Sequence, residues 1–287
     1  MANLKEIRIR ISSVESTIQI TSAMKMVSAA KLKRAQDAII QLRPYANKLT
    51  KMLVNLSASL DSGDGNTFSK EREVKNILFV TITSNRGLCG GFNSNIIKRT
   101  MALIKQEFEN YNCSIISIGK KSSEYFSKNE FNVISTHDDL YNKISFEGVS
   151  EIAESIMNDF ASAKFDKVIL VYNQFKNAAT QIIMTENYLP VETPEGELAT
   201  IGDYIFEPSK TEIVQELIPK SLKTQLFKAI LDSHAAEHGA RMTAMHKATD
   251  NANDLKDDLT LFYNKARQAA ITSEILEIVG GAEALNG

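Results

Sequence analysis

Apolar residues recur at spacings of three and four through the first 60 residues, and this heptad spacing is the feature that most restricts the fold. A seam sustained over so many heptads is typical of a coiled coil rather than of one face of a globular helix. Pro44 lies inside the seam, and because the register continues past it we expect a bend rather than an end of the helix. The turn-forming residues 61–66 should end it. The apolar seam residues are Leu4, Ile7, Ile11, Val14, Ile18, Leu32, Ala35, Ile39, Leu42, Ala46, Leu49, Leu53, Leu56 and Leu60.

A second seam runs through the last part of the chain. We expect a short helix up to Pro219 and then a long helix to about Ile278, with Gly280-Gly281 ending the pattern. Many of its seam positions are Ala, which allows two helix backbones to approach closely. These positions are Phe227, Leu231, Met245, Ala248, Ala252, Leu255, Leu259, Phe262, Ala266 and Ala269.

Each seam has one polar interruption, and the two interruptions predict how the helices pair. Coiled coils use buried polar positions to fix register, so we expect the interruptions to lie opposite each other, to within one turn. Placing Lys25 against His238 pairs Ile11 with Ala252 and leaves about 25 C-terminal residues unpaired. The unpaired end is apolar around much of its surface, which predicts a sleeve made by other subunits. The interruptions are Thr21, Lys25 and Ser28 in the first seam and His234, His238 and Arg241 in the second.

Between the two seams, short apolar runs alternate with amphipathic stretches near residues 94–110, 120–129 and 148–163. Strands that alternate with helices predict a small, mostly parallel, Rossmann-like α/β sheet. The fold class is therefore α/β plus a long antiparallel α-helical coiled coil. We expect an N-terminal helix over 1–66, a central α/β domain over 67–207 and a C-terminal helix over 208–287. The predicted strands are Asn76–Ser84, Ser114–Ile118, Asn132–Ser135, Lys167–Tyr172 and Thr180–Asn187.

Charge is distributed unevenly along the chain. Residues 1–60 carry ten Lys or Arg against Glu6, Glu15 and Asp37, a local balance of +7, so the remainder sums to −9 within a net charge of −2. A basic arm predicts an anionic partner, and composition leaves open a nucleic acid, a membrane surface or an acidic protein. Because Tyr45 is the arm's only aromatic residue, contact with an acidic protein is the more economical interpretation.

Composition also restricts the cellular class. No stretch approaches the roughly 18 uninterrupted apolar residues needed to cross a bilayer, and the first ten residues lack the apolar block of a secretory signal. The two cysteines, Cys89 and Cys113, form neither a CxxC pair nor a metal-binding spacing, so a reducing cytoplasm is the simplest interpretation.

A glycine-rich segment follows the first predicted strand and reads Arg86-Gly-Leu-Cys-Gly-Gly-Phe-Asn93. An α/β protein places phosphate loops at such a strand-to-helix junction. The segment lacks the Lys-Ser/Thr ending of a nucleotide-triphosphate loop and does not match GxGxxG. A tight strand-to-helix turn whose glycines permit positive φ is the favoured interpretation.

The second helix contains a short match to a zinc signature, His234-Ala-Ala-Glu-His238. Two histidines at i and i+4 can share a metal, with Glu237 as a base. Both histidines lie on the seam, however, where they would face a packed element instead of an open cleft, and the sequence nominates no third ligand. We therefore expect no metal site, and no catalytic set of side chains stands out elsewhere.

Four sequence blocks, in order and each in its expected element, resemble the ATP synthase gamma chain family. Two are Ile20-Thr-Ser-Ala-Met-Lys-Met-Val-Ser-Ala-Ala30 in the first helix and Arg86-Gly-Leu-Cys-Gly-Gly91 after the first strand. The others, in the last helix, are Ala240-Arg-Met-Thr-Ala-Met-His-Lys-Ala-Thr-Asp-Asn251 and Tyr263-Asn-Lys-Ala-Arg-Gln-Ala-Ala-Ile-Thr-Ser-Glu-Ile275.

The resemblance implies a rotor shaft inside a ring of alpha and beta subunits. Its α/β domain would dock on epsilon and on the c-subunit ring, with one copy per complex, at the cytoplasmic face of a bacterial inner membrane. It implies no catalytic residue and no cofactor, because nucleotide chemistry belongs to the beta subunits. By match to the family's blocks, Arg267 and Gln268 would bind a loop of beta, and Met24, Lys25 and Arg241 would work against an acidic lever of beta.

Two other classes of function stay open on the residues alone. A chromosome-organising coiled coil also has long antiparallel helices, but it needs ATPase motifs at its ends, which are missing from this sequence. Salt-dependent DNA binding would indicate that class. A nucleotide-binding α/β enzyme using residues 86–93 would instead bind ATP at equilibrium.

Overall fold

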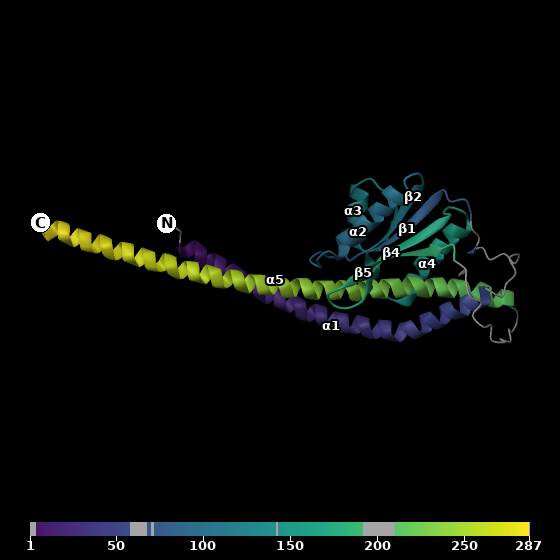
Figure 1. The fold of residues 1–287 in the computed structure, drawn as a ribbon, viewed down its shortest axis with the longest axis horizontal. Coiled ribbons are helices and arrows are strands. Elements are labelled where there is room, and N and C mark those ends of the chain that lie inside the picture. The colour runs from purple at the N-terminus through teal and green to yellow at the C-terminus, as the bar shows by residue number, and fades with distance from the viewer. Residues whose placement is uncertain (1–3, 58–67, 70–71, 142, 192–209, 287) are drawn as a thin grey trace. The chain divides into compact units, whose positions relative to one another are not determined.

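The computed structural model describes residues 4–57, 68–69, 72–141, 143–191 and 210–286 (Figure 1). The chain divides into two compact units, the helical unit (Met1–Val27 with Met242–Gly287) and the sheet unit (Ser28–Arg241). Helix α1 (Leu4–Ser57) and helix α5 (Lys210–Asn286) each contribute a segment to both units. The prediction of two long terminal helices around a central α/β region is confirmed. The expected helix stop at residues 61–66 lies outside the described residues.

A five-stranded sheet in the order β3-β2-β1-β4-β5 organises the sheet unit. The first four strands are parallel, and β5 runs antiparallel to β4. All five predicted strands are confirmed, with ends that differ by a few residues. The strands are β1 (Asn76–Ile82), β2 (Asn112–Ile118), β3 (Val133–Thr136), β4 (Lys167–Phe175) and β5 (Gln181–Leu189). The connecting helices are α2 (Phe92–Ala102), the π-helical turn η1 (Leu103–Glu107), α3 (Lys120–Lys128), the 3-10 turn η2 (Asp139–Tyr141) and α4 (Phe146–Ala161).

The two faces of the sheet bury alternate residues of the same strand, as the two-residue period of a β-strand requires. Leu78 and Val80 of β1 point to the face covered by α4 and by α5, whereas Ile77 and Phe79 point to the face covered by α2 and α3. Because both faces are covered, the strands read as continuous apolar runs. Residues of α5 in the first core are Ile218, Leu222, Leu226, Ala229 and Ile230.

Helix α5 is continuous through Pro219, so the prediction of a separate short helix ending there is wrong. A proline inside a helix costs roughly 3 kcal/mol. Ile218 and Leu222 flank it and are each 2% exposed in the core. Burial of each such side chain contributes roughly 1.5–3 kcal/mol, which offsets the cost. Helix α1 likewise continues through Pro44, as predicted.

The expected end of α5 at Gly280-Gly281 is also wrong, because the helix runs on to Asn286. A glycine in a helix costs only about 1 kcal/mol relative to alanine. The residues that follow, Ala282-Glu-Ala-Leu285, are strong helix formers.

In the helical unit the two helices lie antiparallel, joined by side-chain contacts along their length. Thr21 Oγ1 is 2.8 Å from Thr249 Oγ1, and Lys25 Nζ is 3.3 Å from His246 Nδ1. Nearer the N-terminus, Lys256 Nζ lies 2.9 Å from Glu15 Oε1, and Arg8 Nη2 donates to the Tyr263 hydroxyl at 3.0 Å.

These contacts correct the predicted register. Contacting residue numbers add to 270 or 271, whereas the predicted pairing of Lys25 with His238 adds to 263. The helices are therefore shifted by one heptad, more than the single turn that was allowed. A heptad shift leaves an apolar seam matched, so the seam cannot choose between the two registers. The polar contacts determine the register. Lys25 contacts His246, whereas the polar residues His234, His238 and Arg241 of α5 have their partners inside the sheet unit.

The observed register places Leu4 opposite about residue 267, if the same spacing is continued to the start of α1. The end of α5 beyond that point exposes large apolar side chains, as predicted. These are Ile271, Ile275, Leu276, Ile278 and Val279, with exposed fractions between 43% and 71%.

Cysteine pairs test this register directly. Thr21→Cys with Thr249→Cys should form a disulfide under mild oxidation, because the two native hydroxyl oxygens are in contact. Ile11→Cys with Ala252→Cys, which corresponds to the register shifted by one heptad, is the matched control and should stay reduced. Non-reducing electrophoresis of the folded protein measures both. Crosslinking of the second pair in place of the first would contradict the observed register.

Candidate partner-binding site

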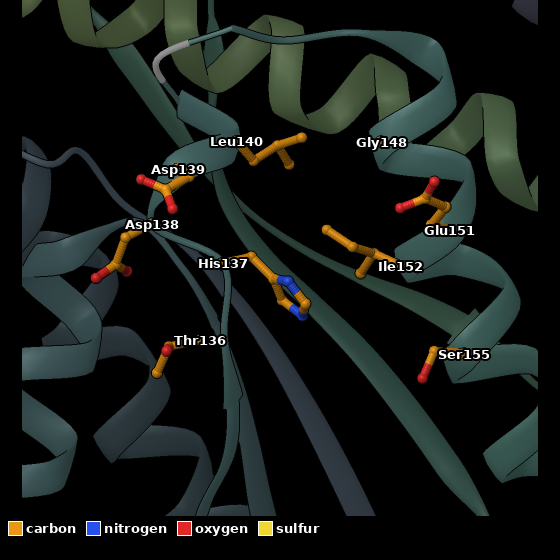
Figure 2. A pocket seen from close by; sticks show the side chains of 9 residues that line it. All are labelled: Thr136, His137, Asp138, Asp139, Leu140, Gly148, Glu151, Ile152 and Ser155. Atoms are coloured by element: carbon orange, nitrogen blue, oxygen red, sulfur yellow. The ribbon is translucent and has the colours of Figure 1, made fainter.

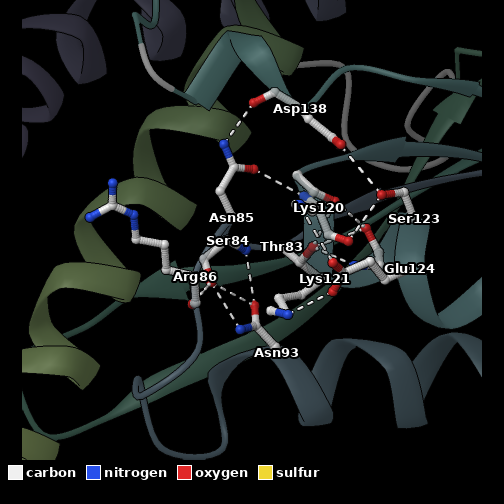
Figure 3. A network of polar contacts seen from close by, with 12 residues as sticks. Thr83, Ser84, Asn85, Arg86, Asn93, Lys120, Lys121, Ser123, Glu124 and Asp138 are labelled. Carbon is white, nitrogen blue, oxygen red and sulfur yellow. Dashed lines mark hydrogen bonds and ion pairs between the residues drawn. The ribbon is translucent and has the colours of Figure 1, made fainter.

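The glycine-rich segment predicted after β1 forms a closed polar turn (Figure 3). Ser84 Oγ donates to the Arg86 carbonyl at 2.7 Å, and the Ser84 amide donates to Asn93 Oδ1 at 2.9 Å. Gly90 has a φ of +60°, so the interpretation as a turn that needs positive φ is confirmed. Leu88 also has positive φ and is 67% exposed at the tip of the turn.

Helix α5 fills the space beside this turn with a buried arginine. Arg241 donates to the carbonyls of Gly87 and Arg86, the second at 3.2 Å, and to Glu237 Oε1 at 2.5 Å. A phosphate loop presents backbone N–H groups to an anion. Here the turn presents two carbonyls to a guanidinium. The position next to β1, where open α/β sheets bind ligands, is therefore used to attach α5.

The two histidines of the zinc-like motif, half-buried His234 and buried His238, form a pair on α5. Their Nε2 atoms are 3.1 Å apart, and the ring of His234 packs edge-on against Tyr141 at 5.9 Å between centroids. Burial lowers the pKa of His234 to about 4 and that of His238 to about 3, with nearby cationic groups adding to the effect. Glu237 forms an ion pair with Arg241. Within the described part of the chain, no group of three or more His, Cys, Asp or Glu side chains is placed to hold a metal ion.

An open cavity of about 360 Å³ lies between the carboxyl end of β3 and helix α4 (Figure 2). His137 enters it from the end of β3, Glu151 lines it from α4, and Asp139 lines its rim. Burial lowers the pKa of His137, which favours its neutral form, and its Nε2 is 3.2 Å from Ser135 Oγ. The sequence did not indicate this cavity, because its lining comes from a strand end and a helix with no shared motif.

The structure places the five predicted partner-binding residues in two different settings. Met24 and Lys25 are half-buried on α1 of the helical unit. Arg267 and Gln268 are exposed on α5 of the same unit, close to where α1 begins opposite it. Arg241 belongs to the sheet unit, is 8% exposed and is fully engaged within the chain. The sequence had not indicated this internal role, although the pairing with Glu237 at i−4 was a readable signal.

Among the described helices, none combines the length and apolar character that a bilayer-spanning segment needs.

These features define a class of protein: an α/β domain inserted between two long terminal helices, one of which is bonded to the turn after β1. A family model described as ATP synthase matches residues 3–285. The ATP synthase gamma chain of Christiangramia forsetii is 60% identical over 287 residues, and that of Flavobacterium johnsoniae is 61% identical over 291, with 100% of both chains covered in each case.

A solved structure has the same architecture. A chain of the central stalk and c-ring of Tetrahymena thermophila mitochondrial ATP synthase aligns with a TM-score of 0.61 and 26% identity, over 80% of this chain and 99% of that one. The chain therefore belongs to the ATP synthase gamma chain family, and the resemblance of the four sequence blocks is confirmed.

The buried histidine pair predicts acid sensitivity. Both folded-state pKa values lie below the unfolded value of about 6.5, so the unfolded chain binds more protons. Stability from the neutral pair is present above pH 6.5 and is lost as pH falls toward 4. His234→Gln with His238→Gln should therefore flatten the fall in urea midpoint between about pH 7 and about pH 5.

Replacement of the exposed His246 by Gln is the control for the loss of a histidine outside the pair. An unchanged slope in the double variant would show that the pair is not the acid-sensitive element.

Proposed function

We propose that this chain is the central rotor shaft of an F-type ATP synthase. In that role it couples proton-driven rotation of a membrane ring to conformational change and ATP synthesis in the catalytic beta subunits. The observation that carries the proposal is the family match over residues 3–285, together with 60% identity to a gamma chain along the whole length.

Each part of the chain has its own proposed partners. The helices of residues 1–66 and 208–287 would stand among the alpha and beta subunits, and the α/β domain of residues 67–207 would meet epsilon and the c-subunit ring. One copy would serve each complex, at the cytoplasmic face of a bacterial inner membrane. The exposed apolar end of α5 supports this placement, because an apolar surface of that extent is covered by protein in a working assembly.

A shaft acts on catalytic sites only through unequal contacts. Rotation changes the state of a beta subunit if the shaft stabilises one of its conformations more than another at a given angle. An antiparallel helix pair presents different side chains on each side, so its surface is asymmetric by construction. Met24 and Lys25 on α1 would meet beta's acidic lever. Arg241, which is buried and bonded within the chain, would act on the same lever indirectly, because it holds α5 to the turn after β1.

We further propose that the chain is a non-catalytic subunit. The turn of residues 86–93 is the strand-to-helix junction where a nucleotide would be expected, and its carbonyls are bonded to Arg241. A phosphate needs free N–H donors, and here the guanidinium donates to two carbonyls of the turn and to Glu237 instead.

The isolated chain should accordingly bind no ATP at micromolar concentrations, measured by equilibrium dialysis. Gly90→Val should leave that result unchanged. Micromolar binding by the parent chain that Gly90→Val abolishes would overturn the non-catalytic assignment and would favour a nucleotide-binding enzyme.

The proposed beta contact at Arg267 and Gln268 provides the test of the rotor function. Both side chains are exposed, and hydrogen bonds to charged groups contribute about 1.5–3 kcal/mol each. Arg267→Ala with Gln268→Ala should lower coupled ATP synthesis in membrane vesicles on the order of tenfold or more. The thermal unfolding of the chain should not change, because neither side chain is buried.

Lys265→Ala, an exposed change on the same helix, is the matched control and should synthesise ATP like the parent. Parent-level synthesis by the double variant would remove this pair from the proposed contact.

A further inference from the structure

A buried carboxylate connects α5 to α1 within the sheet unit. The Asp232 side chain on α5 is 0% exposed, and its Oδ1 lies 3.4 Å from Nη2 of Arg43 on α1, whose side chain is 45% exposed. Asp232 Oδ2 is buried and has no hydrogen-bond partner among the described residues. Asp232 is therefore held by a single long charged contact.

The charges around Asp232 leave Arg43 as its specific partner. Lys228 on α5 and Glu186 on β5 are near enough to influence it, but neither forms a described ion pair with it. Glu186 accepts a hydrogen bond from the Tyr172 hydroxyl on β4 at 2.6 Å. Burial raises the pKa of Asp232, and the charges of Arg43 and Lys228 oppose that rise.

The contact lies next to the proline of α1. Arg43 precedes Pro44, which has no N–H to donate to the carbonyl of Ile40, so the helix lacks one backbone hydrogen bond at this turn. The neighbouring seam positions, including Ile39 and Ala46, are buried. Apolar contacts at such seam positions are non-directional and repeat every heptad, so by themselves they do not fix one axial position of a helix.

A charged pair can fix the axial position of the helix, because it forms only when its two partners lie side by side. Removing one partner leaves a buried charge without compensation, and fixing register is the best-supported use of such a pair. The helical unit gives a precedent within this chain, since its seams tolerate a heptad shift and its polar contacts select the register.

We propose that Arg43 and Asp232 form a lock that holds the Pro44 segment of α1 in one position on α5. The lock makes the two helices of the sheet unit move as one body. Its importance for torque rests on the proposed rotor function, whereas the lock itself is a property of the isolated chain.

Hydrogen exchange measured by mass spectrometry tests the lock in the full chain. Arg43→Gln should speed exchange of the amides of residues 38–45 on the order of tenfold, with the strands of the sheet unchanged. Arg43→Lys keeps the charge and should restore most of the protection. The exposed pair Lys33–Asp37, removed by Lys33→Gln, is the control on the same helix and should have no effect.

A second variant separates a lock from a simple stabilising contact. Arg43→Met with Asp232→Leu replaces the pair by apolar groups, which commonly preserves overall stability. The lock predicts parent-like thermal unfolding together with faster exchange at residues 38–45. Parent-like exchange in this variant, or in Arg43→Gln, would overturn the proposal, as would faster exchange spread evenly over the sheet unit.

The functional consequence has its own measurement. In complexes containing Arg43→Gln, ATP hydrolysis should continue while proton pumping per ATP falls. If residues 38–45 exchange faster but pumping does not change, the lock stands and its role in the proposed rotor is refuted.

Discussion

The structure of the sheet unit depends on the burial of one side of α5 against the sheet. Ile218, Leu222, Leu226 and Ile230 share a core with β1 and α4, so the C-terminal helix is part of the domain and not an attachment to it. This burial explains why α5 passes through Pro219 without a break. It also explains why Arg241 can reach the turn after β1, since the helix is already fixed along the sheet.

The Arg241 contact changes what an α/β fold is used for. Parallel sheets offer a ligand position beside the carboxyl ends of their strands, and many enzymes use it. In this chain the position holds a side chain of the chain itself, bonded to two carbonyls and to Glu237. The position that binds small ligands in many α/β proteins here attaches a helix of the same chain. The histidine pair one turn away extends the same buried polar region.

Local patterns were enough to predict most of the fold. Apolar runs located every strand, and heptads located both long helices, because burial on both faces and at a helical seam each leave a periodic signal. The ends of the last helix were harder to predict. Tertiary packing outweighs the cost of Pro219, and the helix tolerates Gly280-Gly281 at small cost. The register was wrong for a different reason. Sequence shows that His234, His238 and Arg241 are polar, but only the structure shows that their partners lie in the α/β domain.

The residues of the candidate site likewise divide into those that the sequence identified and those whose contacts only the structure shows. Arg267 and Gln268 were identified by their match to the family's last-helix block, and the structure leaves them exposed. The internal bonds of Arg241 and the burial of Asp232 depend on residues distant in sequence, Gly87 and Arg43, and no local pattern announces such pairs.

The unpaired end of α5 also has a consequence for biogenesis. The exposed apolar surface at this end favours aggregation at high protein concentration. It is formed by Ile271, Ile275, Leu276, Ile278 and Val279. A newly made copy that waits alone would tend to self-associate through this end. We therefore expect the chain expressed alone to aggregate at high concentration unless another protein covers this end.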